Sequence, residues 1–261
     1  MNPAMGQLGF HIEMKLADGR VLVTSIAERR LLARIVLDKG RDCGLLAMRA
    51  PDTHLHVVAA CTRRVAGVFV SRVRRSLRQR LDLPVRFAAP YIEPIRDQRH
   101  LYNASRYVFR QDEHHGVDVD PWAEASNLPD LLGLRQVGVY TVANVSRLLP
   151  RIRPEELVRH LGVTLEQLDD CATMAGAVDS LAAAAAAAVA LPDVGGQAPV
   201  AIAARRAAVA LVGDCLPTRR IAALLGTTDR AVRRLRSRPA DPALVTAVAR
   251  QLRLRSAVTV R

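Results

Sequence analysis

Three short segments near the start of the chain carry the residue pattern of β-strands, with period-two alternation or short apolar runs bounded by turn residues. They are GFHIEMKL (9–16), CGLLAMRA (43–50) and HLHVVAAC (54–61). The turn residues Pro51, Asp52 and Thr53 separate the second segment from the third, so we expect these two to be neighbouring strands. The segment RVLVTS (20–25) predicts either a further strand or the lead into a helix.

Apolar residues recur at helical spacing between and after these strands. The three segments concerned are residues 27–40, 65–83 and 96–113. The resulting order of strand, helix, strand, strand and helix predicts an α+β domain with a small, ferredoxin-like antiparallel sheet and packed helices. The pattern ends between Trp122 and Arg135, and we therefore predict a first domain over residues 1–135.

The remainder of the chain, residues 136–261, carries only helical patterns and predicts an all-α region. Helices are expected within 155–172, 181–199 and 205–239. The alanine run inside the second of these segments is of low complexity and suggests no chemistry.

The composition narrows the class of partner. The 261 residues carry a formal net charge of +13 and are 50% hydrophobic but only 3% aromatic. So positive a charge favours a polyanion, most often nucleic acid, although an arginine-rich codon usage would raise the charge as well. An RNA-binding sheet is disfavoured, because such a sheet stacks bases on exposed aromatic rings.

The cysteines and the apolar runs predict the compartment. Cys43, Cys61, Cys171 and Cys215 lie far apart and form no CxxC pair, which is typical of free thiols in a reducing compartment. No secretory apolar segment follows the first residues, and the longest apolar run, 181–191, is too short to span a bilayer. We therefore expect a cytoplasmic protein without a membrane partner, either a monomer or a homodimer.

Candidate chemistry begins at the third predicted strand. His54 and His56 occupy alternate positions there and should point to one face of the sheet. Tyr107 and Gln111 stand four positions apart in the helix predicted over 96–113, so they share a helix face about 5–6 Å apart at Cβ. If that helix crosses the strand, the two imidazoles and the Gln111 amide can bind Mg²⁺ or Mn²⁺. Tyr107 is then a candidate nucleophile for phosphodiester cleavage.

These residues stand in segments that resemble a known family. LLAMRAPDTHLHVVAA (45–60) resembles the strand, turn and strand of the single-tyrosine HUH transposases, in which the two histidines bind a metal. HLYNASRYVFRQDEHHG (100–116) resembles the helix that carries their catalytic tyrosine. The resemblance covers roughly residues 9–135, and the REP-associated tyrosine transposases are the most similar branch.

The resemblance implies an HUH endonuclease type of fold and an activity. It implies a metal-dependent endonuclease and strand transferase acting on single-stranded or hairpin DNA, with REP-like palindromes as candidate targets. Residue by residue, His54 and His56 match the metal-binding histidines, Gln111 the third ligand and Tyr107 the nucleophile. Attack by Tyr107 would give a 5′-phosphotyrosine intermediate and a free 3′-hydroxyl.

Other features leave alternatives open. The family's flanking motifs are altered here at residues 50–53, 111–116 and 16–20, so a domesticated, catalytically inactive DNA-binding regulator is the second hypothesis. Tyr102 is a rival nucleophile, on a different helix face from Gln111. His114 and His115 form a second histidine pair, but adjacent helical residues diverge by about 100°.

Two basic helices predict contacts with DNA. The segment 70–81 presents arginines that can hold the DNA backbone, and the tyrosine helix adds another. Residues 217–239 fit a helix-turn-helix, with Ala222 at the helix contact, Gly226 in the turn and Val232 packing back. The arginines predicted to contact DNA are Arg72, Arg75, Arg78, Arg106, Arg230, Arg233 and Arg234. A solvated basic surface is the alternative in each case.

Overall fold

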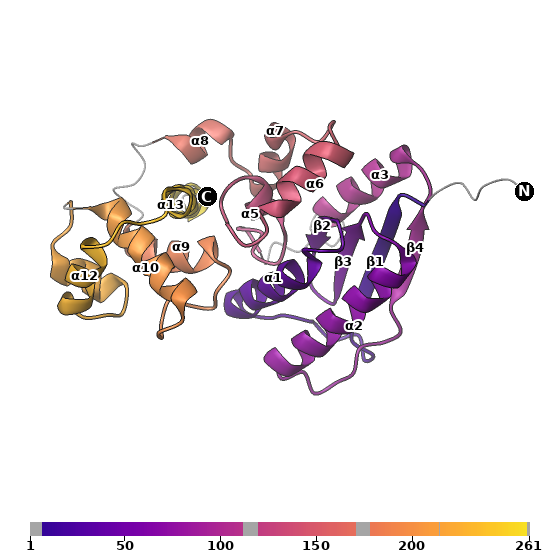
Figure 1. The fold of residues 1–261 in the computed structure, drawn as a ribbon, viewed down its shortest axis with the longest axis horizontal. Helices are drawn as coiled ribbons and strands as arrows, with labels where there is room; N and C mark the ends of the chain where they lie inside the picture. Colours follow the sequence, from indigo (N-terminus) through magenta and orange to yellow (C-terminus); the bar gives the residue numbers. More distant parts are fainter. Residues whose placement is uncertain (1–6, 112–119, 171–177, 214, 260–261) are drawn as a thin grey trace, which may run out of the picture.

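The protein has an α+β fold in which a four-stranded antiparallel sheet occupies the N-terminal part and helices follow (Figure 1). The computed structural model describes residues 7–111, 120–170, 178–213 and 215–259. The strands are β1 (Gly9–Lys15), β2 (Leu45–Arg49), β3 (His54–Ala59) and β4 (Tyr91–Ile95). They lie in the order β2-β3-β1-β4, so β3 and β1 are the central strands. The three strands predicted from the pattern are confirmed.

Strand β4 was not predicted from the sequence. It contains Pro94, and Pro90 precedes it, and proline argues against a central strand because it cannot donate to a sheet. The structure resolves this conflict by placing β4 at the edge of the sheet, paired only with β1. The segment 20–25 forms no strand. It leads into helix α1 (Ile26–Gly40), where Ser25 and Glu28 form a capping box.

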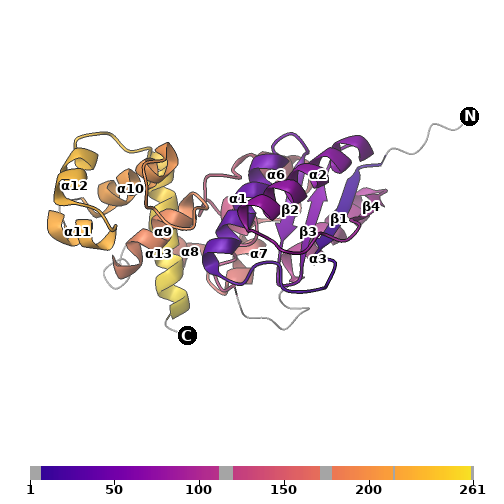
Figure 2. The same cartoon turned by 90° about the horizontal axis from the view of Figure 1, so that it is seen from below.

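Helices cover both faces of the sheet (Figure 2). Helices α1 and α2 (Arg63–Arg80) lie over one face, where Phe10, Ile12 and Met14 of β1 enter an apolar core with residues of both helices. Helix α3 (Gln98–Phe109) lies over the other face and packs against β2 and β3. Because strand side chains alternate, His11, Glu13 and Lys15 of β1 belong to the α3 face.

Within the described residues, every regular element after α3 is helical. These elements are α5 (Leu128–Leu131), α6 (Tyr140–Leu148), α7 (Pro154–Leu157), η1 (Val158–Leu161), α8 (Leu165–Asp169), η3 (Val178–Ser180), α9 (Leu181–Ala188), α10 (Pro199–Val212), α11 (Thr218–Leu224), α12 (Asp229–Arg236) and α13 (Pro242–Thr259). The all-α domain predicted over residues 136–261 stays a prediction. Helix α13 was not predicted. It packs against α8, α9 and α10, and so forms the centre of the C-terminal part.

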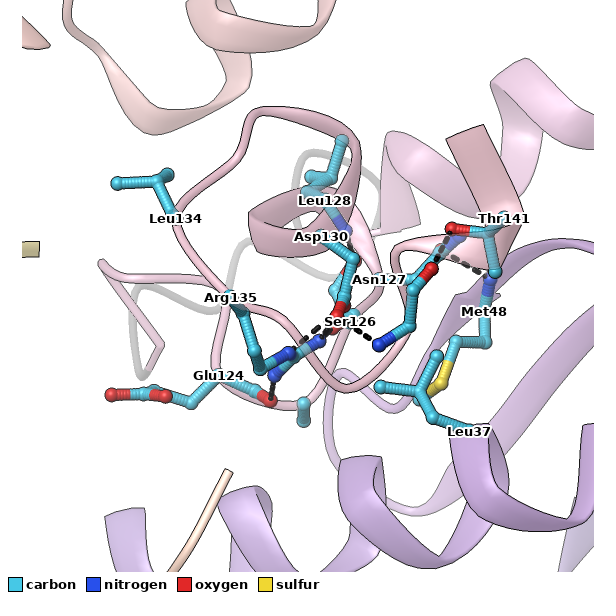
Figure 3. Close-up of polar contacts among 12 residues, drawn as sticks. Leu37, Met48, Glu124, Ser126, Asn127, Leu128, Asp130, Leu134, Arg135 and Thr141 are labelled. Atoms are coloured by element: carbon cyan, nitrogen blue, oxygen red, sulfur yellow. Dashed lines mark hydrogen bonds and ion pairs between the residues drawn. The ribbon is translucent and has the colours of Figure 1, made fainter. Parts of the chain in front are cut away.

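A buried polar network holds residues 124–135 against the sheet (Figure 3). Arg135 donates to Asp130 at 2.9 Å through Nε and to the carbonyl oxygens of Glu124 and Ser126. Asn127 completes the edge of β2, because its Oδ1 accepts from Met48 N at 2.8 Å and its Nδ2 donates to Leu46 O at 3.0 Å. These bonds satisfy main-chain groups that would otherwise be buried without partners.

Residues before and after the predicted domain boundary at residue 135 contact one another. The Glu124 carboxylate is buried between Arg30 of α1 (Nη2–Oε1 2.8 Å) and Arg255 of α13. Burial by itself would raise the pKa of Glu124, but the charges of Arg255 and Arg30 hold it below its ordinary value. One apolar cluster also joins Val58 and Val108 to Leu254 of α13. Residues from both sides of the boundary therefore share a core.

Candidate active site and basic grooves

Two of the three predicted metal ligands lie on the central strand β3. His54 and His56 share the face covered by α3, as their spacing predicted, and their ring centroids are 4.4 Å apart. The side chain of His56 is almost completely buried, with 2% of its surface exposed. The strand therefore holds two imidazoles side by side on the inner side of α3.

Tyr107 faces these histidines from α3. The helix begins after Asp97, whose side chain accepts from His100 N at 2.8 Å, and it is anchored to the sheet by Leu101 and Val108. The Tyr107 ring meets the His56 ring edge-on, with centroids 5.7 Å apart. Yet 42% of Tyr107 is exposed, so the phenol is accessible from outside the protein. The structure thus brings Tyr107 and His56 together across the helix–sheet interface.

His11 of β1 also belongs to this cluster, although sequence reasoning missed it. Its ring stacks on His56 with centroids 5.3 Å apart, and its Nε2 lies 3.2 Å from Nδ1 of His56. It also meets Tyr107 edge-on at 6.0 Å. Burial lowers the pKa of His11, while the carboxylates of Glu93 and Glu13 oppose this shift, so the ring favours its neutral form. The signal was present in the sequence, because His11 and Glu13 alternate with apolar residues in the first predicted strand.

His54 and His56 are both contacted at ring nitrogen Nδ1. Nδ1 of His54 lies 2.9 Å from the hydroxyl oxygen of Thr53 and 3.8 Å from Oδ1 of Asp52, while Nδ1 of His56 contacts His11. Metal-binding histidines in proteins are oriented in this way by a partner on the other nitrogen. Cation binding through Nε2 of both rings stays a prediction.

The third predicted ligand, Gln111, lies just after the end of α3. Gln111 is buried, and its amide nitrogen lies 3.5 Å from the carbonyl oxygen of Tyr107, four residues earlier. Its role as a ligand stays a prediction. No group of three or more His, Cys, Asp or Glu side chains within the described residues has an arrangement that could hold a metal ion. His114 and His115 lie outside the described residues.

The rival nucleophile, Tyr102, lies elsewhere on α3. Its ring packs against the apolar cluster beneath the helix and under the guanidinium of Arg106, 5.5 Å from the ring centroid. Among the described residues, the ring contacts of the histidines of β1 and β3 are with one another and with Tyr107, not with Tyr102. The geometry therefore favours Tyr107 over Tyr102.

Two adjoining basic grooves flank α3. The first, of about 520 Å³, is called here the α3–α7 groove. Its lining residues are Arg106, Arg110, Arg151, Arg153, Glu155, Glu156, Arg159 and His160. The second, the α3–α6 groove of about 820 Å³, is lined by Gln98, Arg99, Tyr102, Asn103, Arg147, Leu148, Leu149, Pro150 and Arg151. Arg151 lines both grooves, so a strip of basic residues runs along the helix that carries Tyr107.

Of these groove arginines, sequence reasoning singled out Arg106 alone. Its Nε lies 3.0 Å from Oε1 of Glu156, which orients the side chain at the groove wall. Arg99 lies on α3 and Arg110 at its C-terminal end. The remaining groove arginines lie in the turns and helices between residues 147 and 159, which the packing of Leu149, Ile152 and Leu157 into the shared apolar cluster holds beside α3. Nothing in the local sequence indicates that packing.

The predicted arginines of α2 lie on the opposite side of the sheet. Arg72, Arg75 and Arg78 are exposed, but α2 covers the face away from Tyr107. Arg75 and Arg78 line a groove of about 790 Å³ beside Arg74, which donates to Phe87 O at 2.8 Å. Any DNA contact made by α2 would therefore involve a different stretch of DNA from the one at Tyr107.

The predicted helix-turn-helix has two contacting helices, α11 and α12. Ala222 and Val232 are buried at their contact, and Gly226 occupies the turn with φ +58°. Thr228 caps α12, because its hydroxyl accepts from Ala231 N at 3.2 Å. The predicted DNA-contacting residues of α12, Arg230, Arg233 and Arg234, are exposed.

Comparison with protein-family models, with curated proteins and with solved structures finds no match to this chain. No helix in the described part is long and apolar enough to cross a membrane. The cysteines Cys43, Cys61 and Cys215 form no disulfide there, and burial raises the pKa of Cys43 to about 12 and that of Cys61 to about 11. These two thiols are therefore protonated at neutral pH, and Cys171 lies outside the described residues.

Proposed function

We propose that this protein is a metal-dependent, single-stranded DNA endonuclease and strand transferase of the single-tyrosine HUH type. The observation that carries the proposal is the position of Tyr107, an accessible phenol set edge-on to His56 and beside a pair of strand histidines. The element order β1-α1-β2-β3-α2-β4 and the sheet order β2-β3-β1-β4 support a ferredoxin-like arrangement. We retain a cytoplasmic location as part of the proposal.

The reacting groups come from α3 and β3. Tyr107 Oη attacks the scissile phosphorus, forming a tyrosine–phosphate bond at the 5′ side and breaking the bond to the 3′ oxygen. The phenol proton is transferred, overall, to the leaving 3′ oxygen, so no water is consumed and the reaction can be reversed. A bound Mg²⁺ or Mn²⁺ would polarise the scissile phosphate. His54 and His56 would hold it through Nε2, with Thr53 and His11 fixing the two rings from Nδ1.

The substrate strand is proposed to follow the two basic grooves. Single-stranded DNA is held mainly through its phosphates, so a strip of arginines along α3 suits it. The α3–α7 groove carries five arginines against two glutamates, of which Glu156 pairs with Arg106, so the groove keeps a positive balance. The exposed arginines of α12 would contact the duplex part of a hairpin, for which REP-like palindromes are the candidate.

The second hypothesis, a non-cleaving DNA-binding regulator, uses the same grooves and the same α11–α12 pair. It differs only in the chemistry of Tyr107. A hairpin oligonucleotide with a single-stranded extension and a fluorophore at its 3′ end tests this point with full-length protein and Mn²⁺. Nucleophilic attack leaves the labelled 3′ fragment covalently attached to the protein, which migrates as a labelled band in a denaturing gel.

The expected result is a labelled band with the parent protein and with Tyr102→Phe, and none with Tyr107→Phe. Hairpin binding by Tyr107→Phe should stay within about twofold of the parent, because only one hydroxyl is lost. An adduct that survives in Tyr107→Phe but not in Tyr102→Phe would assign the chemistry to Tyr102. A parent protein that binds a panel of hairpins and forms no adduct would instead support the regulator.

A further inference from the structure

A small, strongly basic pocket lies between α10 and α12, away from the tyrosine site. It has a volume of about 290 Å³. Its lining residues are Gln197, Ile202, Arg205, Arg206, Thr227, Thr228, Arg230, Ala231, Arg234, Leu235 and Arg238. A volume of this size is at the lower limit of small-ligand pockets, which begin at roughly 300 Å³.

The lining carries five guanidinium groups and no carboxylate. Arg230, Arg234 and Arg238 stand four residues apart along α12 and the turn after it, and Arg205 and Arg206 come from α10. Within the described residues none of the five has an Asp or Glu oxygen at 4.0 Å or less. The acidic residue in the first turn of α12, Asp229, does not line the pocket. Like charges gathered in this way repel one another unless an anion joins them.

The two arginines of α10 also hold unsatisfied donors. Arg205 is more than nine-tenths buried, with 8% of its surface exposed. Its Nη2 donates to Gly196 O at 2.7 Å, which fixes the side chain, but its Nε is buried with no acceptor among the described residues. The same holds for Nε of Arg206. Buried donors in native proteins are almost always paired, so an acceptor brought by a ligand is the simplest account of both.

The start of α12 adds to the positive field of the pocket. Thr227 and Thr228 line it where the helix begins, and Thr228 is the N-cap. The N-terminus of a helix favours an anion, because its unpaired N–H groups and its dipole point toward the ligand.

We propose that this pocket binds a phosphate group. Planar guanidinium groups match the oxygens of phosphate in bidentate fashion, which suits five of them around a small pocket. The phosphate can come from a free phosphorylated small molecule or from the backbone of duplex DNA, and the pocket's chemistry is the same for both. The inference does not rest on the tyrosine chemistry, since no residue of the pocket belongs to α3 or to the sheet.

Calorimetry with the full-length protein separates the two sources. Sodium pyrophosphate is one titrant and a blunt 16-base-pair duplex is the other, with ionic strength matched by NaCl. Arg206→Gln and Arg234→Gln test the pocket. Lys39→Gln is the control for the loss of one positive charge, because Lys39 is exposed on α1 and lines neither the pocket nor any of the grooves. Circular dichroism and the thermal midpoint establish that each variant is folded.

The expected result is that Arg206→Gln and Arg234→Gln weaken binding by about tenfold each, the effect of one lost charge-assisted hydrogen bond, while Lys39→Gln leaves it within about twofold. If this pattern is seen with pyrophosphate, the pocket binds the phosphate of a free small molecule. The same pattern with the duplex alone assigns the DNA backbone. Equal binding by the parent and both pocket variants overturns the proposal, as does a parent that binds neither titrant. Adduct formation by Tyr107 is measured separately, so the failure of one proposal is distinguishable from the failure of the other.

Discussion

The ring of Tyr107 meets the ring of His56 edge-on, with centroids 5.7 Å apart, although the two residues lie on different elements and are far apart in the sequence. Helix α3 makes this contact because its apolar residues Leu101 and Val108 bind it to the sheet and leave Tyr107 beside the histidines. A nucleophile placed on a helix and ligands placed on a strand are both held by regular structure. Such a site is positioned with more precision than one built on loops.

The histidine pair predicts a measurable affinity for Mn²⁺. His54→Ala should weaken Mn²⁺ binding by at least about tenfold, and Thr53→Ala should weaken it by about tenfold or more, because loss of an orienting partner typically costs 10–100-fold in affinity. Electron paramagnetic resonance of free Mn²⁺ in a titration gives both constants. His160→Ala is the control, since His160 lies in the α3–α7 groove. Unchanged Mn²⁺ binding in His54→Ala would exclude the strand site.

The basic grooves predict where single-stranded DNA lies. Arg153→Gln removes an exposed charge from the α3–α7 groove, and should lower the slope of log affinity against log salt by about 0.7 for one lost phosphate contact on a single strand. Arg72→Gln removes an equivalent charge from α2, on the other face of the sheet, and should leave the slope for a short single strand unchanged. Fluorescence anisotropy at several NaCl concentrations measures both slopes. A lower slope for Arg72→Gln and an unchanged slope for Arg153→Gln would place the single-stranded DNA across α2.

Replacing Glu124 should lower the stability of the protein by an amount that depends on pH. Glu124→Gln should lower the free energy of unfolding at pH 7 by about 3–5 kcal/mol, because it leaves the buried guanidinium groups of Arg30 and Arg255 without their carboxylate. The folded pKa of Glu124 is lowered, so its contribution is fully present above the unfolded pKa of about 4.3 and is lost as the pH falls through the folded value. Below about pH 4.3 the difference between parent and variant should therefore shrink.

Urea unfolding between pH 3 and pH 7 measures this difference. Glu155→Gln is the control, because Glu155 is exposed, and it should change the free energy of unfolding by less than about 0.5 kcal/mol. A variant Glu124→Gln as stable as the parent at pH 7 would show that the buried network contributes no net stability.

Replacing each of two glycines by alanine should change the stability of the protein in opposite directions. Gly226→Ala should destabilise the protein by about 1–2 kcal/mol, because φ is +58° there and a side chain is strained in that region even though the space around it is open. Gly67→Ala lies inside α2, where an added methyl group also meets no atom within 4 Å, and should stabilise by about 0.5–1 kcal/mol. Thermal unfolding compares the two. A stabilised Gly226→Ala would mean that the turn between α11 and α12 differs from the one described.

The sequence by itself determined the elements whose local pattern agrees with their environment. The period of two in residues 54–59 placed His54 and His56 on one face, and the helical spacing of 98–109 placed Tyr107 on a helix. The offsets among Ala222, Gly226 and Val232 predicted the two contacting helices at 218–236, because a small residue, a left-handed turn and an apolar anchor are local requirements.

Only the tertiary structure decided which of these residues meet. His11 joined the site because β1 pairs with β3 from Phe10 opposite Ala59 to Lys15 opposite His54. Pairing between distant segments cannot be predicted from either segment alone. Strand β4 went unpredicted because Pro94 opposes a strand everywhere except at an edge, and the edge exists only once the sheet has formed. The arginines of the two grooves and of the α10–α12 pocket converge from separate helices. Each set combines arginines from segments far apart in the chain, so the packing of the apolar faces beneath them set their positions.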